Sequence, residues 1–295
     1  MSSQLQLLNF VVSTISDNNI FHIFAFDIIK YYNNKSSNAY ILATNIDKNS
    51  NVQKWRYFVM NKLYDCKYID EVKQLDLLPR FKCQQFHSGY DCWKFIKYKQ
   101  DLHISKIYKK IISDKKEGKY ILLNVRDDVR ILYDNDSGLE LEVFLQQNTK
   151  RLNAPFRYCN FSKMKPEEQF EVCHNACVFI SAHGAGCTNL IFTPQKTPLI
   201  EVNFRKHWYC DNVCDKHRNG EISMNEKCDG KLTYRPYFHK ADYHNLCYLL
   251  GKQYLEIEAT KYDGGFLSKN PISKKQIYIN GDKLINDINN SLICN

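Results

Sequence analysis

One segment, KPEEQFEVCHNACVFISAHGAGCTNLIFTPQKTPLIEVN at residues 165–203, constrains the fold more than any other part of the chain. Pro166 and the two glutamates after it suit the first turn of a helix. Residues 177–181 form a short apolar run, and small residues follow at 183–186 before a second helix and a second strand. Helix, strand, turn, helix and strand in this order predict a parallel α/β layer.

The turn between the first strand and the second helix predicts an anion site. Its residues are His183, Gly184, Ala185 and Gly186. Glycine at the carboxyl end of a strand lets the backbone approach a ligand, and the next helix directs its N–H groups and positive dipole end to the same place. A phosphate would fit there. From spacing alone, a small-residue turn with a histidine that caps the helix is an equal alternative.

Several stretches resemble the family 61 glycosyltransferases. AHGAGCTNLIF followed by PLIEV is similar to the central signature of that family, and EEQFEVCHNACVFIS resembles the element before it. LLNVRDDVRIL resembles the family's strand with arginines, with Arg126 and Arg130 at the matching places. NNIFHIFAFDII is similar to the pattern that opens the first domain. Cys187 replaces a usual aliphatic residue and Ile23 a common tryptophan, and neither change removes a group that could do chemistry.

The resemblance implies an α/β fold of GT-B-like architecture, with two Rossmann-like domains facing across a cleft. It implies that a hexosyl or pentosyl group moves from a nucleotide diphosphate donor to a hydroxyl of a glycan or glycoprotein, with inversion. We expect the donor to be linked to uridine diphosphate (UDP). Fixed cationic groups would stabilise the departing diphosphate, so we expect no metal requirement.

The donor site is expected in the C-terminal domain. A guanidinium recognises phosphate oxygens bidentately, which favours Arg126 and Arg130, although spacing alone favours surface pairs with Asp127 and Asp128. Glu201 ends the next strand, where it would contact ribose hydroxyls or simply be solvated. The expected donor-binding residues are Arg126, Arg130, His183, Gly184, Ala185, Gly186, Thr188, Asn189 and Glu201.

The catalytic base is expected in the N-terminal domain, at His22 or Asp27. Asparagines that can cap a helix precede His22, so it would lie near the first turn, where the dipole disfavours the protonated imidazole. A neutral imidazole can accept a proton near neutral pH. Five residues of helix rotate Asp27 about 140° away from His22, so the two would not share one site. A packed histidine in an apolar helix is the alternative for His22.

Asp134, Asn135 and Asp136 form the D-x-D pattern that many glycosyltransferases use to hold a divalent cation. A metal-dependent transferase is therefore the second enzyme hypothesis. The same residues precede the helical pattern GLELEVFLQQ and suit a turn and an N-cap, which is the interpretation that we favour.

A structural zinc ion is the remaining cofactor hypothesis. Thiolates and an imidazole in a loop with little core could hold zinc, but their spacing here matches no common zinc module. Reduced loop cysteines are the favoured interpretation, and no cofactor is expected to be required. The four residues of this zinc hypothesis are Cys210, Cys214, His217 and Cys228.

The length of 295 residues favours two α/β domains, each large enough for its own core. The polar sequence DKKEGK, residues 114–119, marks the boundary. We expect an acceptor-side domain at 1–117, a nucleotide-sugar-binding domain at 118–280 and a terminal helix at 281–295.

The formal net charge of +9 arises from 41 basic and 32 acidic residues spread along the chain. Such a field suits a nucleotide diphosphate, whereas nucleic acid usually requires a basic stripe with aromatic residues, so no nucleic-acid partner is expected. A non-catalytic module that binds a glycan or nucleic acid is the rival from another class. The chain shows no signal sequence and no apolar run of about 18 residues, so we expect a cytoplasmic protein with reduced cysteines and no membrane span.

Overall fold

The computed structural model describes residues 10–12, 20, 40–42, 50–64, 108, 109, 111, 112, 117–127, 130–203, 241–263 and 276–293. The chain divides into two compact units. One unit comprises Met1–Asp114 and Lys165–Glu168, and the other comprises Lys115–Met164 and Gln169–Asn295. The expected limits of the domains and the GT-B arrangement stay predictions.

The first unit contains β1 (Phe10–Val12), which pairs in parallel with β2 (Tyr40–Leu42), and α3 (Asn51–Tyr64). Trp55 and Val59, four residues apart, are both buried and define the inner face of α3. The helix expected around His22 and Asp27 lies outside the described residues, except for one helical residue at position 20.

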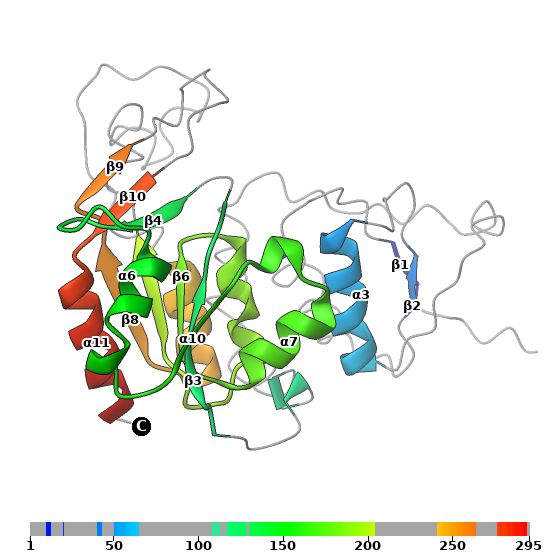
Figure 1. Cartoon of the computed structure of the whole chain (residues 1–295). Coiled ribbons are helices and arrows are strands. Elements are labelled where there is room, and N and C mark those ends of the chain that lie inside the picture. The colour runs from blue at the N-terminus through cyan, green and yellow to red at the C-terminus, as the bar shows by residue number, and fades with distance from the viewer. Residues whose placement is uncertain are drawn as a thin grey trace, which may run out of the picture. The chain divides into compact units, whose positions relative to one another are not determined.

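The second unit contains a five-stranded parallel sheet in the order β5-β3-β6-β7-β8 (Figure 1). Its strands are β3 (Tyr120–Asn124), β5 (Phe156–Cys159), β6 (Ala176–Ala182), β7 (Leu199–Asn203) and β8 (Tyr254–Glu258). The expectation of an α/β fold with a parallel layer is confirmed. After β3 the chain adds β5 on one side, and from β6 onward it continues on the other side. The strand order therefore reverses between β3 and β6, where open α/β sheets bind their ligands.

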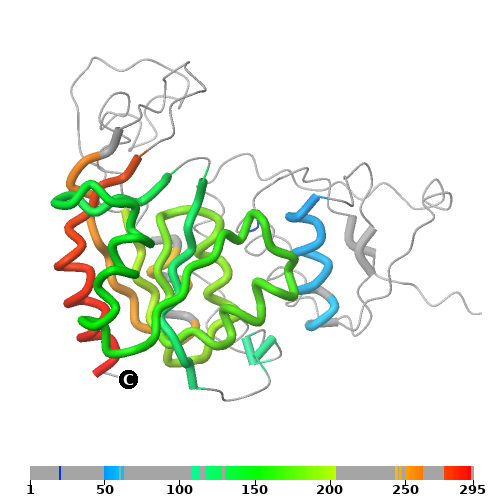
Figure 2. The backbone as a smooth tube through the Cα atoms, in the orientation of Figure 1, coloured from blue at the N-terminus to red at the C-terminus, as the bar shows by residue number. Residues whose placement is uncertain are grey.

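A smaller sheet in the order β4-β10-β9 and several helices complete this unit, and the tube in Figure 2 shows the path between them. The strands are β4 (Ile131–Asp134), β9 (Lys261–Asp263) and β10 (Gln276–Ile279). The α-helices are α6 (Leu141–Gln147), α7 (Pro166–His174, whose residues up to Glu168 belong to the first unit), α10 (Ala241–Leu250) and α11 (Gly281–Ile293). The 3₁₀ helices are η3 (Thr149–Arg151), η4 (Phe161–Lys163) and η5 (Ala185–Phe192). The helix expected after the glycine turn is thus a 3₁₀ helix.

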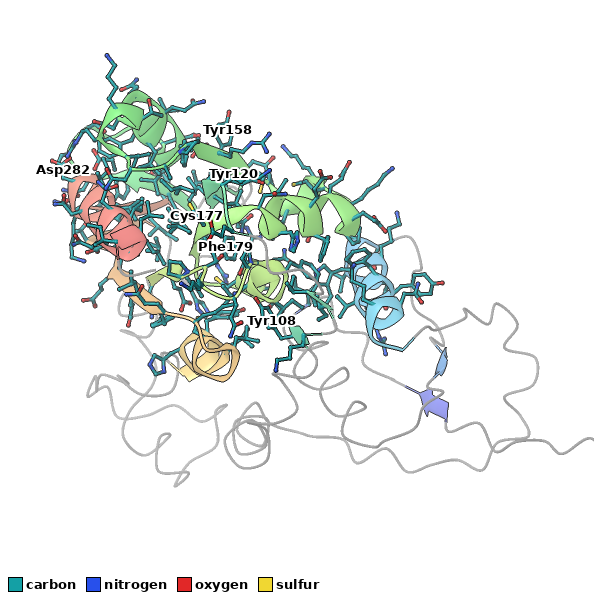
Figure 3. All side chains as sticks on the ribbon, turned by 90° about the horizontal axis from the view of Figure 1, so that it is seen from below. Tyr108, Tyr120, Tyr158, Cys177, Phe179 and Asp282 are labelled. Carbon is teal, nitrogen blue, oxygen red and sulfur yellow. The ribbon has the colours of Figure 1, made fainter. Side chains whose placement is uncertain are left out.

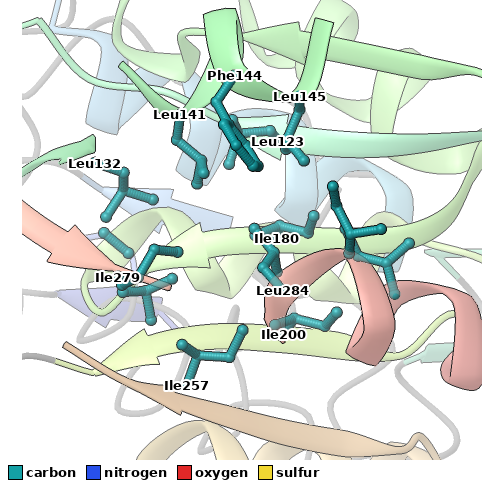
Figure 4. Packing of buried hydrophobic residues seen from close by; sticks show 14 of the residues in the cluster. Leu123, Leu132, Leu141, Phe144, Leu145, Ile180, Ile200, Ile257, Ile279 and Leu284 are labelled. Atoms are coloured by element: carbon teal, nitrogen blue, oxygen red, sulfur yellow. The ribbon is translucent and has the colours of Figure 1, made fainter. Parts of the chain in front are cut away.

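Side chains alternate between the two faces of the five-stranded sheet, because successive residues of a strand point to opposite sides. One face carries an apolar core beneath α6 and α11, where each fully buried Leu, Ile or Phe contributes about 1.5–3 kcal/mol (Figure 4). The core includes Leu123, Ile180, Ile200 and Ile257 from the sheet, and Leu141, Phe144, Leu145 and Leu284 from the helices. The alternate positions carry the buried polar residues Asn124, Ser181 and Glu201. Polar groups therefore gather on one face near the strand ends.

The edge of the sheet differs from its centre (Figure 3). Tyr158 on the edge strand β5 is 47% exposed, whereas Phe179 on the central strand β6 is fully buried. Tyr120 donates a hydrogen bond to the carbonyl oxygen of Val172 at 2.8 Å, and the guanidinium of Arg157 lies 4.9 Å from its ring centre.

Within the described ranges, none of the helices has the length and apolar character needed to cross a membrane.

Candidate functional site

The carboxyl ends of β3 and β6 form the floor of the candidate site. Asn124 at the end of β3 donates a hydrogen bond from Nδ2 to Oγ of Ser181 on β6 at 3.0 Å. A Cβ atom on Gly186 would lie 2.5 Å from that same Nδ2. Because Asn124 is buried and held by Ser181, glycine at 186 is what lets η5 begin this close to the two strand ends.

Two arginine side chains reach the turn at Gly184. This glycine has φ 152° and ψ −177°, a backbone conformation that disfavours other residues. A Cβ atom there would overlap Nη1 of Arg130 and would lie 4.0 Å from Nη1 of Arg126. Its positive φ therefore favours glycine at 184, and a side chain there would also displace the guanidinium of Arg130.

Arg130 has a left-handed backbone conformation with φ 62°, unlike any other non-glycine residue in the described ranges. Such a conformation costs about 1–2 kcal/mol for an L-residue. The side chain donates a hydrogen bond from Nη1 to the carbonyl oxygen of His183 at 2.7 Å. Unfavourable backbone conformations of this kind concentrate at functional sites, where the surrounding structure maintains them.

The main chain of the turn presents N–H groups rather than carbonyl groups. The carbonyl oxygen of Gly184 accepts hydrogen bonds from Oη of Tyr243 at 2.7 Å and from the N–H of Cys187 at 3.0 Å. Among the described residues, no atom accepts a hydrogen bond from the N–H groups of Gly184, Ala185 and Gly186. Three N–H groups at a helix start with two guanidiniums beside them form an arrangement whose chemistry suits an anion.

His183 belongs to a buried network that crosses three strands. Its Nδ1 is hydrogen-bonded to Oε1 of Glu201 on β7, and Oη of Tyr254 on β8 donates to Oε2 of the same carboxylate at 2.8 Å. Glu201 is fully buried. Burial, and then the Glu201 carboxylate, raise the pKa of Tyr254, so its hydroxyl stays protonated. The alternative of a solvated Glu201 is wrong, because the residue is buried and both of its oxygens have partners inside the protein. The expected ribose contact stays a prediction.

Thr188 and Asn189, the other expected donor-binding residues, are fully buried in η5. Asn189 donates to Oε1 of Gln169 at 3.0 Å, and Gln169 in turn donates to the carbonyl oxygens of Phe161 and Met164. These bonds hold η5 against the segments before it. Oγ1 of Thr188 has no hydrogen-bond partner in the described part of the chain. Their contact with a donor stays a prediction.

Asp127 does not depend on the arginines for a partner. Lys163 forms an ion pair with its carboxylate, and Nδ2 of Asn160 donates to it at 3.0 Å. The Lys163 and Asn160 bonds lower the pKa of Asp127. Asp128, the other expected surface partner, lies outside the described residues.

Asp134 of the D-x-D pattern closes a turn, as expected, but the expected N-cap of the helix that follows is wrong, because the N-cap of α6 is Glu140 and it makes no side-chain cap hydrogen bond. Its Oδ2 accepts bonds from the N–H and Oγ of Ser137 at 2.7 and 2.6 Å, and its Oδ1 accepts from the N–H of Gly281 at 2.8 Å. Asp134 therefore closes the turn after β4 and caps the start of α11, while Asp136 is exposed. Three donors occupy the oxygens that a cation would need.

The base candidates His22 and Asp27 lie outside the described residues, as do the four residues of the zinc hypothesis, Cys210, Cys214, His217 and Cys228. Sequence reasoning missed Tyr243 and Tyr254. Each is separated from its site partner by more than 50 residues, and neither stands in a local pattern that marks it.

A family model described as Glycosyltransferase 61 matches residues 36–200, more than half of the chain. The chain belongs to glycosyltransferase family 61. Membership supports glycosyltransferase activity and implies a sugar donor and an acceptor. The match includes both arginines and the turn of this family 61 protein but ends before Glu201, Tyr243 and Tyr254. A search of curated proteins found no significant match.

Proposed function

We propose that this protein transfers a sugar, with inversion, from a nucleoside diphosphate donor to a hydroxyl of a glycan or glycoprotein. UDP is the proposed nucleotide. The donor would bind at the carboxyl ends of β3 and β6, and the acceptor would bind on the N-terminal side in a GT-B arrangement. Family membership supports the class of reaction.

The observation that carries the proposal is the convergence of two guanidiniums on one glycine. Arg126 and Arg130 reach Gly184 from the segment after β3, at the point where the strand order reverses. A nucleoside diphosphate offers the planar oxygen pairs that guanidinium groups recognise. The unbonded N–H groups of 184–186 add donors that point at no described acceptor.

The same groups would act on the reaction itself. Negative charge grows on the diphosphate as its bond to the sugar breaks, and donors that the protein already holds in place stabilise that charge without reorganisation. His183 would add a further donor beside them. A general base, His22 or Asp27 in our proposal, would take the proton of the acceptor hydroxyl.

Metal independence is part of the proposal. The arginines supply positive charge at the expected diphosphate position, and Asp134 already accepts three hydrogen bonds. A cation at Asp134 would compete with the Ser137 donors that close the turn after β4 and with the N–H of Gly281 at the start of α11. The metal-dependent alternative through Asp134 and Asp136 would therefore lose hydrogen bonds that are retained if Asp134 has a structural role.

Titration calorimetry of the full chain with UDP tests the site. Arg126→Ala and His183→Ala should each weaken binding by about 1.5–3 kcal/mol, the worth of a charge-assisted hydrogen bond. Arg151→Ala is the matched control, because this exposed arginine on η3 forms an ion pair with Asp282 at 2.7 Å. UDP affinity that is equal in all three folded variants would contradict the donor site.

Incubation with a panel of nucleotide sugars then separates an enzyme from a binding module. Slow release of the free nucleotide diphosphate identifies the donor even without an acceptor. Tight nucleotide binding with no release from any donor would favour the non-catalytic module. Salt-dependent retention on DNA in place of UDP binding would favour a nucleic-acid partner.

A further inference from the structure

Glu201 has a position that ordinary strand-end glutamates avoid. It is fully buried, yet carboxylates are almost never fully buried unless they are paired. Its two oxygens meet two different donors, the ring of His183 and the hydroxyl of Tyr254. A buried carboxylate with both oxygens hydrogen-bonded indicates a role other than that of a solvated glutamate at a strand end.

The chemistry of the three groups determines where the protons are. An ionised carboxylate only accepts hydrogen bonds, so the bond to Nδ1 requires a proton on that nitrogen. Tyr254, whose pKa is raised by burial and by Glu201, keeps its hydroxyl proton and donates it to Oε2. Nδ1 of His183 is thus committed to Glu201, so a hydrogen bond from this ring to a ligand would have to come from Nε2.

Other elements restrain the same ring. The ring of Tyr243 on α10 lies 5.6 Å from that of His183, and Arg130 holds the carbonyl oxygen of His183. Cys187 on η5 is close enough to Glu201 for the carboxylate, after burial, to help raise the pKa of its thiol. Among the described residues, the titratable and charged groups that face the network also include the thiol of Cys247 near Glu201, and Glu256 and His244 beside Tyr254.

We propose that Glu201 and Tyr254 are positioning residues that fix a proton on Nδ1 of His183 and present Nε2 to the diphosphate of the donor. The identity of that ligand rests on the proposed function. To donate to a phosphate oxygen, Nε2 must also carry a proton, so His183 is doubly protonated in the complex. The Glu201 charge then balances the imidazolium inside the protein, as carboxylates do for buried histidines at other sites.

Nitrogen NMR on the full chain labelled with ¹⁵N-histidine tests the first part. The chain has nine histidines, and the signal missing from His183→Ala identifies His183. The free protein should show Nδ1 protonated, and the UDP complex should show both nitrogens protonated. A His183 ring with its only proton on Nε2 in the free protein, or with only one protonated nitrogen in the UDP complex, would overturn the proposal.

Two variants test the second part. Glu201→Gln keeps the shape but can donate as well as accept, so the proton is no longer fixed on Nδ1, and UDP should bind at least about 10-fold more weakly. Tyr254→Phe removes one donor to the carboxylate and should shift affinity in the same direction by less. Tyr243→Phe is the control, because it removes the bond to Gly184 and should leave the Nδ1 proton in place.

The outcomes separate this inference from the proposed function. If the wild-type chain does not bind UDP, the donor is wrong, while the spectrum of the free protein still decides whether Glu201 fixes the proton. If UDP binds and both Glu201→Gln and Tyr254→Phe bind it unchanged, the positioning roles are wrong. Should Glu201→Gln fail to fold, the wild-type spectra and Tyr254→Phe decide.

Discussion

Arg130 and His183, separated by 53 residues, are joined by a 2.7 Å hydrogen bond from the guanidinium of one to the main-chain carbonyl of the other. The bond connects the segment after β3 to the turn after β6, the two chain segments on either side of the reversal in strand order. It also keeps the charged end of Arg130 beside Gly184. The donor site proposed here depends on this connection more than on any other.

The first prediction concerns the left-handed backbone of Arg130. At a φ of 62° alanine has the same unfavourable backbone energy as arginine, whereas glycine adopts this φ without that cost. Arg130→Gly should therefore be more stable than Arg130→Ala by roughly 1 kcal/mol. Both variants should lose UDP affinity at least about 10-fold, because both lack the guanidinium. Urea unfolding and calorimetry measure the two quantities. Equal stabilities would show that the backbone of residue 130 relaxes after substitution.

The second prediction separates a cap from a metal site. Asp134→Asn should lower the free energy of unfolding by about 1–3 kcal/mol, because a buried acceptor of three bonds is impaired, and exposed Asp136→Asn should have little effect. Excess chelator should leave turnover unchanged. If chelation stops turnover, manganese restores it and both variants lose activity, the metal-dependent mechanism is correct.

The acid sensitivity of Asp134 has a defined sign. Burial raises its pKa, but the bonds from Ser137 and Gly281 outweigh this and leave the pKa below its ordinary value. Its contribution to stability should therefore be complete above the pKa of the unfolded chain and should disappear as the pH falls through the folded pKa. The stability difference between the wild type and Asp134→Asn, measured against pH, tests this.

The third prediction uses a buried lysine. Lys252 donates from Nζ to Oγ1 of Thr193 at 2.9 Å and to the carbonyl oxygens of Thr193 and Pro194, and burial lowers its pKa to about 7. Between about pH 7 and 10 the unfolded chain then holds the extra proton, so the free energy of unfolding should rise with pH by up to about 1.4 kcal/mol per unit. Lys252→Met should remove this slope. Parallel pH profiles of the two proteins would mean that Lys252 stays charged inside the fold.

The fourth prediction concerns the general base. Under donor saturation, loss of the base should reduce turnover by roughly 100-fold or more while donor affinity is preserved. We expect this result for His22→Ala. Near-normal turnover in that variant, with a selective loss in Asp27→Asn, would assign the role to Asp27.

Much of the second unit could be predicted because its pattern is local. Apolar runs bounded by turns marked β3, β6 and β7, and the proline with two glutamates marked α7. The short edge strand β5 was missed, since FRYC exposes two of its four side chains and has no clear period. β9 and β10 are also short, and β10 pairs with β4, which lies far away in the sequence.

The turn and the arginines of the candidate site could be predicted from the sequence, but the buried residues that bond to the turn could not. The glycines predicted that the backbone of the turn lies close to another group, and in the structure these groups are the side chains of Arg130 and Asn124. The burial of Glu201 could not be predicted, because it depends on which face of β7 lies under the helices. Tyr243 and Tyr254 bond to groups more than 50 residues away, and no periodicity reports such contacts.

Alternation along β7 has a consequence for how the sheet assembles. Glu201 lies between Ile200 and Val202, which enter the apolar core on the opposite face. A slip of one residue in pairing would exchange these faces, leaving a carboxylate among leucines and isoleucines and an isoleucine against His183. The pairing of β7 with β6 is thus selected by charge as well as by hydrophobicity. A chain folded in the wrong register would be unable to form the proposed donor site at all.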